Sequence, residues 1–430
     1  MKLRPSTLIE FSMMLVVVGS SLRNVTSAEF DGVVYSALGN FLREAAFPLA
    51  IVGFVILLVR FVIIKGDIRA NWSAPAVLLL CFQVGLIFRT GLLDEMDVRL
   101  VLGLVLQCLI VLIFSIGLPT IRKNGGWLKE LTVGAAFACC LYVLENVYEF
   151  ILNGAATTWK GRFLGLTNHP NFLGVSAAHS CVLLFAFVLD AKIQKRVRFV
   201  FGFLALGAGW LVFASGSRTA FISCIFGLLL LAFISGGKKA IRYVFMLSPF
   251  LLVGAVIYFS SGTSDYDVNS YRFASTQNTR SETWSALLDN FNGSPFWGVG
   301  YQTAGTASSY LRALASSGIF GCVPLAFALV IILAKWCRLV LFVKRNAYDF
   351  RFAAIPLLLT TLTGAVTEGY LLDLFTLPLL LFYMEMFSIA YLDRLVAKPI
   401  WLYGSEDATS TLRSRNSKKS GHKGLPPVSQ

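Results

Sequence analysis

Apolar stretches of about 20 residues recur along the whole chain and are separated by short polar breaks. A bilayer core about 30 Å thick requires roughly 20 apolar residues per helix, and backbone polar groups in lipid must be satisfied within the helix itself. The pattern therefore predicts an all-α, polytopic integral membrane protein with about 12 transmembrane helices. The predicted spans are 8–22, 46–64, 74–89, 100–118, 131–151, 171–189, 199–215, 219–234, 243–260, 311–334, 352–368 and 371–392. The first span also admits interpretation as a signal peptide, because small residues follow a short apolar stretch.

Composition and charge narrow this picture. Hydrophobic residues make up 56% of the chain and charged residues 14%, which excludes a soluble domain of this length. The net charge of +14 does not indicate nucleic acid, because 27 of the 37 lysines and arginines fall in the two ends and in every second break. By the positive-inside rule, both termini are predicted to be cytoplasmic. The ten basic residues on the opposite side are Arg23, Arg43, Arg89, Arg99, Lys160, Arg162, Arg218, Arg272, Arg280 and Arg312.

The eight cysteines lie in or beside apolar runs, with no CxxC pair and no histidine at metal-ligand spacing. We therefore expect neither a disulfide framework nor a metal site, and no cofactor.

The chain is predicted to form one transmembrane domain over 1–402 and a disordered cytoplasmic tail over 403–430. Two outward segments, 152–170 and 261–307, are longer than a connection requires, and the second is a large extracytoplasmic loop before the tenth helix. Within it, apolar residues at helical spacing over 278–291 predict an amphipathic helix on the membrane surface. These residues are Trp284, Leu287, Leu288 and Phe291.

Three separate outward segments each supply an arginine: Arg162, Arg218 and Arg280. A guanidinium stays charged and offers a planar fork of donors, so several converging at a membrane surface suit a phosphate or diphosphate headgroup. A single interfacial arginine often does no more than reach lipid headgroups. Arg218 is harder to explain in that way, because a tight turn containing Ser215 and Ser217 holds it at the hydrocarbon boundary.

The residues around these arginines resemble the O-antigen ligase and polymerase superfamily. The motifs are Arg162-x-x-Gly165, His-Pro-Asn-x-x-Gly over 169–174, Ser217-Arg218, Arg280-x-x-x-Trp284, Ser294-Pro295-x-x-Gly298-x-Gly300, and Tyr310-Leu311 through Gly318-x-x-Gly321. They cover 162–321 in the family's order, and no one of them is specific alone.

The resemblance implies a metal-independent glycosyltransferase that acts on a glycan linked to undecaprenyl diphosphate at the periplasmic face. It also implies that Arg162, Arg218 and Arg280 bind the diphosphate. The supporting residues that the motifs suggest are Asn171, Ser217, Trp284 and Ser308. The expected partners are the lipid-linked glycan, membrane lipid and other polysaccharide assembly proteins.

The chain departs from the ligase pattern at one point. Ligases carry a His-Asn pair just before the Tyr-Leu segment, and Ala307 and Ser308 stand there in this chain. Because alanine cannot accept a proton, either the chain is not a lipopolysaccharide ligase or another group serves as the general base. The candidates are His169, Glu368 and Asp373; His169 is equally consistent with a helix cap, and Glu368 with an ion pair to an arginine.

The missing histidine favours a polysaccharide polymerase for O-antigen or exopolysaccharide. The alternative within the family is a ligase that transfers finished glycan to lipid A-core or to protein. A different class, a flippase or exporter of the lipid-linked sugar, also accommodates outward arginines, but transporters tend to place ionisable groups near the midplane. Here Glu385 is the main acid of that kind.

Overall fold

The computed structural model describes residues 5–22, 33–63, 68, 70–93, 98–122, 126–154, 156–159, 161–167, 169–235, 280–301, 308–344, 348–373 and 375–397. These residues are almost entirely helical. The α-helices are α1 (Pro5–Ser21), α2 (Ala37–Ile63), α3 (Ala74–Gly91), α4 (Val98–Leu112), α5 (Leu118–Ile121), α6 (Gly126–Asn153), α7 (Pro170–Leu189), α8 (Lys195–Ala214), α9 (Arg218–Ile234), α12 (Ser281–Gly293), α13 (Ser309–Lys344), α14 (Ala354–Ala365) and α15 (Leu377–Ala397). The shorter elements are the π-helix η2 (Ile113–Gly117), the 3-10 helices η5 (Phe350–Ala353) and η6 (Tyr370–Leu372), and the strands β1 (Thr158–Trp159) and β2 (Arg162–Phe163).

Every predicted span within the described residues overlaps a helix, so the all-α prediction is confirmed. Seven of the described helices are long and apolar enough to cross a membrane. Three shorter apolar helices lie over Ser6–Ser21, Arg218–Ile234 and Phe350–Ala365. The ninth predicted span, 243–260, and the tail over 403–430 lie outside the described residues, as does most of the loop over 261–307. The count of about twelve spans therefore stays a prediction.

Helix α2 begins at Ala37, well before the predicted start at 46. The hydroxyl of Ser36 accepts a hydrogen bond from the backbone N–H of Gly39, at 3.0 Å. The carboxylate of Glu149 in turn accepts from the backbone N–H of Ser36 at 2.8 Å and from its hydroxyl at 2.5 Å. A carboxylate at a helix N-terminus is favoured by unpaired N–H groups and by the helix dipole. Glu149 of α6, which is distant in sequence, thus stabilises the first turns of α2. These turns are polar, so the sequence alone predicts a loop there.

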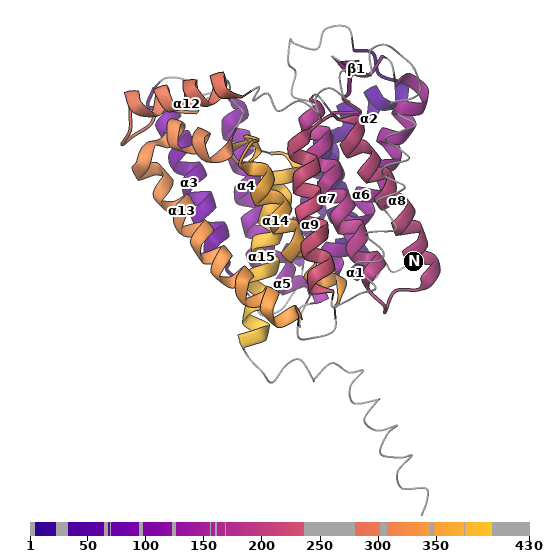
Figure 1. Cartoon of the computed structure of the whole chain (residues 1–430). Helices are drawn as coiled ribbons and strands as arrows, with labels where there is room; N and C mark the ends of the chain where they lie inside the picture. Colours follow the sequence, from indigo (N-terminus) through magenta and orange to yellow (C-terminus); the bar gives the residue numbers. More distant parts are fainter. Residues whose placement is uncertain are drawn as a thin grey trace, which may run out of the picture.

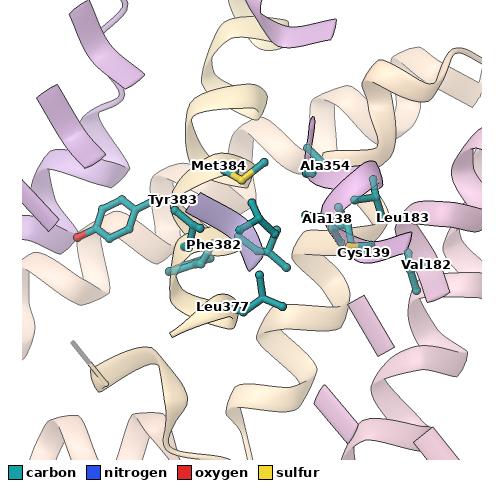
Figure 2. Close-up of a cluster of buried hydrophobic side chains, with 14 of the residues drawn as sticks. Ala138, Cys139, Val182, Leu183, Ala354, Leu377, Phe382, Tyr383 and Met384 are labelled. Carbon is teal, nitrogen blue, oxygen red and sulfur yellow. The ribbon is translucent and has the colours of Figure 1, made fainter. Parts of the chain in front are cut away.

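Helix α7 lies at the centre of the bundle, where it packs against α6, α8, α9 and α14. Its membrane-spanning window is 83% buried, against 28% for α2 and α13, which expose many apolar side chains. Figure 2 shows the core around it, where Cys139 of α6 and Leu183 of α7 gather with Ala354 of α14 and Phe382 and Met384 of α15. Helices α14 and α15 lie between α6, α7, α8 and α9 on one side and α3 and α13 on the other (Figure 1).

The two ends of the bundle differ. Helix α12 and the β1–β2 hairpin lie at one end, and α5 and the last turn of α15 lie at the other (Figure 1). At the α5 end, ion pairs join Lys192 to Asp349 and Arg338 to Asp393, each at 2.9 Å. Burial would raise the pKa of Asp349, but hydrogen bonds from Arg351 and Lys192 hold it down to about 2. This is the end that the distribution of basic residues predicts to face the cytoplasm.

Helix α13 bends sharply at Gly318, which has φ 64° and ψ −174°. The bend breaks the helical hydrogen-bond ladder, and the segment after α12 takes up the released groups. Val299 N–H donates to Ala315 O and Gly300 N–H to Ser316 O, both at 2.9 Å, and Ile319 N–H donates to Pro295 O at 2.9 Å. A Cβ at Gly298 would collide with the Ser316 backbone, and one at Gly318 with the Phe296 backbone. The two glycine motifs therefore form one close backbone contact.

Candidate functional site

The β1–β2 hairpin buries Arg162 at the end of the bundle that carries α12. Trp159 pairs with Arg162 across the antiparallel strands, and Gly161 turns the chain with φ 70°. The Arg162 side chain is 3% exposed. Its Nε donates to the carbonyl of Ser215 at 2.7 Å, and its Nη2 donates to the Oδ1 of Asn171. Both of these acceptors are uncharged, and together they fix the orientation of the guanidinium.

Nearby glycines let three segments approach one another at this point. Gly165, with φ 58°, passes so close to Asn146 that a Cβ would collide with the amide oxygen of that residue, which accepts from Leu166 N–H at 2.8 Å. A Cβ at Gly174 on α7 would collide with side chains of the α8–α9 turn. Two glycines of the family motifs thus have a steric reason to be glycine.

The α8–α9 turn places Arg218 at the first position of α9. Gly216 has φ 59°, and the Ser217 hydroxyl caps the helix by accepting from Ala220 N–H at 3.3 Å. Ser215 and Ser217 are both buried. The N-terminus of α9 therefore lies beside the carbonyl that binds Arg162, and the positive end of its dipole adds to the charge there.

His169 caps α7. Its Nδ1 accepts a hydrogen bond from the backbone N–H of Asn171 at 3.0 Å, and Pro170 occupies the first turn, where a missing N–H is tolerated. A neutral imidazole that accepts at Nδ1 carries its proton on Nε2. In this geometry the lone pair of His169 is engaged by the backbone, as expected for a cap.

Asn171 links Arg162 to the turn after α14. While its Oδ1 accepts from Arg162, its Nδ2 donates to Oε2 of Glu368 at 3.2 Å. The other oxygen of Glu368, Oε1, accepts from Nη2 of Arg280, the residue directly before α12. Residues from four separate parts of the chain thus meet in the order Arg162, Asn171, Glu368 and Arg280.

Burial is the largest influence on Glu368, whose side chain is 9% exposed, and it raises the pKa of this carboxyl. The charge and hydrogen bond of Arg280, the hydrogen bond of Asn171 and the charge of Arg162 lower the pKa, without offsetting burial. A carboxyl with a raised pKa and a cationic neighbour is suited to proton transfer.

The first turn of α13 fixes the turn that carries Glu368. Ser309 donates to the Glu368 carbonyl from its backbone N–H at 2.9 Å and from its hydroxyl at 2.6 Å. Arg312, which is 1% exposed, donates to Gly369 O at 3.2 Å and to Asp373 Oδ1 at 3.0 Å. Sequence reasoning did not assign these roles to Ser309 and Arg312; their proximity to the Tyr310-Leu311 motif was the available signal.

The remaining predicted residues lie around this cluster. Trp284 is one turn into α12, and its N–H donates to Arg280 O at 2.8 Å, which confirms a helix in the segment predicted to be amphipathic. Ser308 is buried directly before α13, and its hydroxyl accepts from Leu311 N–H at 3.4 Å. Asp373 is engaged by Arg312, and Ala307 lies outside the described residues. Among the residues that the structure describes, no three His, Cys, Asp or Glu side chains are grouped to hold a metal.

Residues 201–326 match the family model described as O-antigen ligase. The resemblance recognised in the motifs is confirmed over this segment, which includes Arg218, Arg280 and the Gly298–Gly318 contact. Arg162 and Asn171 precede it and Glu368 follows it. No curated protein and no solved structure matches the chain. The family match and the apolar helices together fit a multi-pass membrane protein of polysaccharide biosynthesis.

Proposed function

We propose that this protein is a glycosyltransferase of the bacterial inner membrane that joins glycan units carried on undecaprenyl diphosphate at the periplasmic face. The observation that supports it most is the convergence of Arg162, Asn171, Glu368 and Arg280 at one end of the bundle. Helices α7, α9 and α13 all begin at this end, so their dipoles also favour an anion. A diphosphate headgroup is an anion of the right class for such a site.

In the proposed reaction, Arg162, Arg218 and Arg280 bind the diphosphate of the donor. The acceptor hydroxyl oxygen bonds to the anomeric carbon while the bond from that carbon to the diphosphate oxygen breaks. The electron pair leaves with undecaprenyl diphosphate, and guanidinium groups stabilise the charge that develops there. The hydroxyl proton passes to a carboxylate, so atoms and charge balance with no further reactant.

Glu368 is the base that we propose. Its ion pair with Arg280 determines whether the carboxylate is free to accept a proton. A diphosphate competes with Glu368 for the Arg280 guanidinium, since both are anions that bind the same donors. Binding of the donor then releases the carboxylate beside the scissile bond. His169 is the weaker candidate, because its Nδ1 lone pair already accepts from Asn171 N–H. We assign His169 to the cap of α7.

We favour a polymerase of O-antigen or exopolysaccharide, because Ala307 stands where ligases carry their histidine. A ligase that acts on lipid A-core or protein is the second candidate, since the matching family model bears the description O-antigen ligase. Glycan analysis of a deletion strain distinguishes them. A polymerase deletion leaves single repeat units, whereas a ligase deletion accumulates long polymer on undecaprenyl diphosphate. Transfer of lipid-linked glycan across liposomes with no change in glycan length would instead indicate a flippase and contradict both.

A further inference from the structure

A second polar cluster lies inside the bundle, away from the arginines. His179 of α7, Thr361 of α14 and Glu385 of α15 are each 1% exposed or less. His179 Nε2 is 2.8 Å from the hydroxyl oxygen of Thr361, which lies 3.0 Å from Oε1 of Glu385. At the other side of the imidazole, His179 Nδ1 is 2.8 Å from the carbonyl oxygen of Val175. Three helices thus contribute to one continuous hydrogen-bonded row.

The number of protons in this row follows from its geometry. A carbonyl oxygen only accepts, so Nδ1 of His179 carries a proton that it donates to Val175. Thr361 has a single hydroxyl proton, yet its oxygen contacts both Nε2 and the carboxyl group. With neutral His179 and ionised Glu385, that one proton would serve only one contact, and the other would bring two lone pairs together. One additional proton resolves the conflict.

Two arrangements of the additional proton satisfy every contact. In the first, the carboxylic acid of Glu385 donates to Thr361, and Thr361 donates to Nε2 of His179. In the second, an imidazolium donates to Thr361, and Thr361 donates to the carboxylate. Both have zero net charge, which the apolar surroundings favour. The first contains no separated charges, so it is the arrangement we expect in a medium of low polarity.

Glu385 also lines a small cavity in the described part of the chain. Among the described residues, Oε2 is buried and has no hydrogen-bond partner. The cavity has a volume of about 20 Å³, enough for one water molecule, and Thr132 and Ser388 are the other polar residues that line it. Leu183, Ala354 and Met384, which Figure 2 labels, form part of the apolar wall. The neighbouring titratable group is Tyr370, whose hydroxyl donates to the backbone carbonyl of Thr361 at 2.5 Å and leaves the Thr361 hydroxyl unaffected.

We propose that His179, Thr361 and Glu385 form a proton-binding site in the membrane-embedded core, which holds one proton shared along the row. Moving one proton at each end of Thr361 converts one arrangement into the other, so the row is also a short proton relay. The site is independent of glycosyl transfer at the outward end, and its acid, Glu385, lies well inside α15.

Two spectroscopic measurements on the full-length protein in lipid vesicles test the proposal. The chain has three histidines, so a ¹⁵N-histidine spectrum is readily assigned with the variants His169→Gln and His422→Gln. We expect a neutral His179 protonated at Nδ1 and accepting at Nε2. The infrared spectrum should contain a carboxylic acid band that is lost in Glu385→Gln, whose amide still donates to Thr361. Asp393→Asn is the matched control, because Arg338 binds that acid, and it should retain the band.

An imidazolium signal from His179 without the band would identify the second arrangement and equally support one bound proton. A neutral His179 protonated at Nε2 would overturn the proposal, and this measurement needs only wild-type protein in addition to the assignment variants. The proposal would also be overturned if folded Glu385→Gln kept every carboxylic acid band of the wild type while His179 was neutral. None of these outcomes depends on whether glycosyl transfer occurs.

Discussion

Glu368 and Glu385 are both buried acids near the last two helices, yet their surroundings have opposite character. Glu368 lies at the outward end against Arg280, with Asn171 and Arg162 beyond it. Glu385 lies in the core against Thr361 and His179. In the first site cations stabilise the carboxylate of Glu368, and an anionic ligand can replace that carboxylate as the partner of Arg280. In the second, neutrality is restored by a proton. Burial alone therefore does not determine what a membrane acid does; the nearest donor does.

Glu368→Gln should produce the largest effect at the outward site. Glutamine keeps the size of the side chain but cannot accept the acceptor's proton, and loss of a general base typically costs 10²–10⁴-fold in rate. The measurement is polymer synthesis from lipid-linked repeat units in membranes. Asp393→Asn, which alters an acid paired with Arg338 at the opposite end, is the control. A Glu368→Gln enzyme with wild-type turnover would remove Glu368 from the reaction.

Alanine at Arg162, Arg218 or Arg280 should nearly abolish long-chain polysaccharide. Removal of one preorganised donor from a developing anion costs about 10²–10³-fold in rate. Lysine should rescue poorly, because it lacks the bidentate fork. Polymer length on gels and protein level in the membrane are measured together, with Arg338→Ala, at an exposed residue of the opposite end, as control. Normal polymer from all three alanine variants would rule out the proposed diphosphate site.

The pH dependence of polymer synthesis should report on Glu368. A base acts when deprotonated, so activity is present above its pKa and lost as the pH falls through it. Because burial raises the pKa of Glu368 above the usual 4.5, the acid limb should lie at higher pH than for an exposed glutamate. Asn171→Ala removes a hydrogen bond that lowers this pKa and should move the limb to still higher pH. An acid limb that stays in place in this variant would contradict the assignment.

Gly298→Ala and Gly318→Ala should destabilise the protein by about 1–3 kcal/mol each, from backbone strain at positive φ and from the collision of each new Cβ with backbone. Thermal unfolding in detergent measures the effect. Gly293→Ala is the matched control, because a Cβ there meets nothing within 4 Å. Equal melting temperatures for all three variants would show that the contact is dispensable.

His169→Asn should have the smallest effect. Asparagine is itself a good N-cap, and a whole cap is typically worth about 1 kcal/mol, so activity should fall by less than about tenfold. Purified protein and a turnover assay are sufficient for this test. A loss as large as that of Glu368→Gln would transfer the role of base to His169.

Local patterns were sufficient to predict where the described apolar helices and the amphipathic segment lie, because apolar periodicity and capping residues act within a few positions, but they missed the early start of α2. The outward position of Arg162, Arg280 and Glu368 made them candidates, and the family motifs added Asn171. They did not show which of these side chains touch, since Arg280 and Glu368 lie far apart in the sequence and meet only through the packing of α12, α13 and α14.

The sequence patterns also did not predict the ion pair between Arg312 and Asp373 or the bend at Gly318, for a related reason. An arginine near the start of a predicted span is typical of an interfacial side chain, and a glycine within an apolar run is compatible with a straight helix. In each case the signal lies in a partner segment. The Ala307 region lies outside the described residues, so its part in the site stays a prediction.

The close contact between Gly298 and Gly318 has a consequence for how the sequences of related proteins should vary. Each glycine leaves room for the backbone beside the other. A larger residue at either position therefore pushes the same two backbone segments apart, the one around Gly298 and the one around Gly318. The two positions should therefore change together, and with the length of the segment between them, rather than independently. In an alignment of relatives they should behave as a single inherited unit.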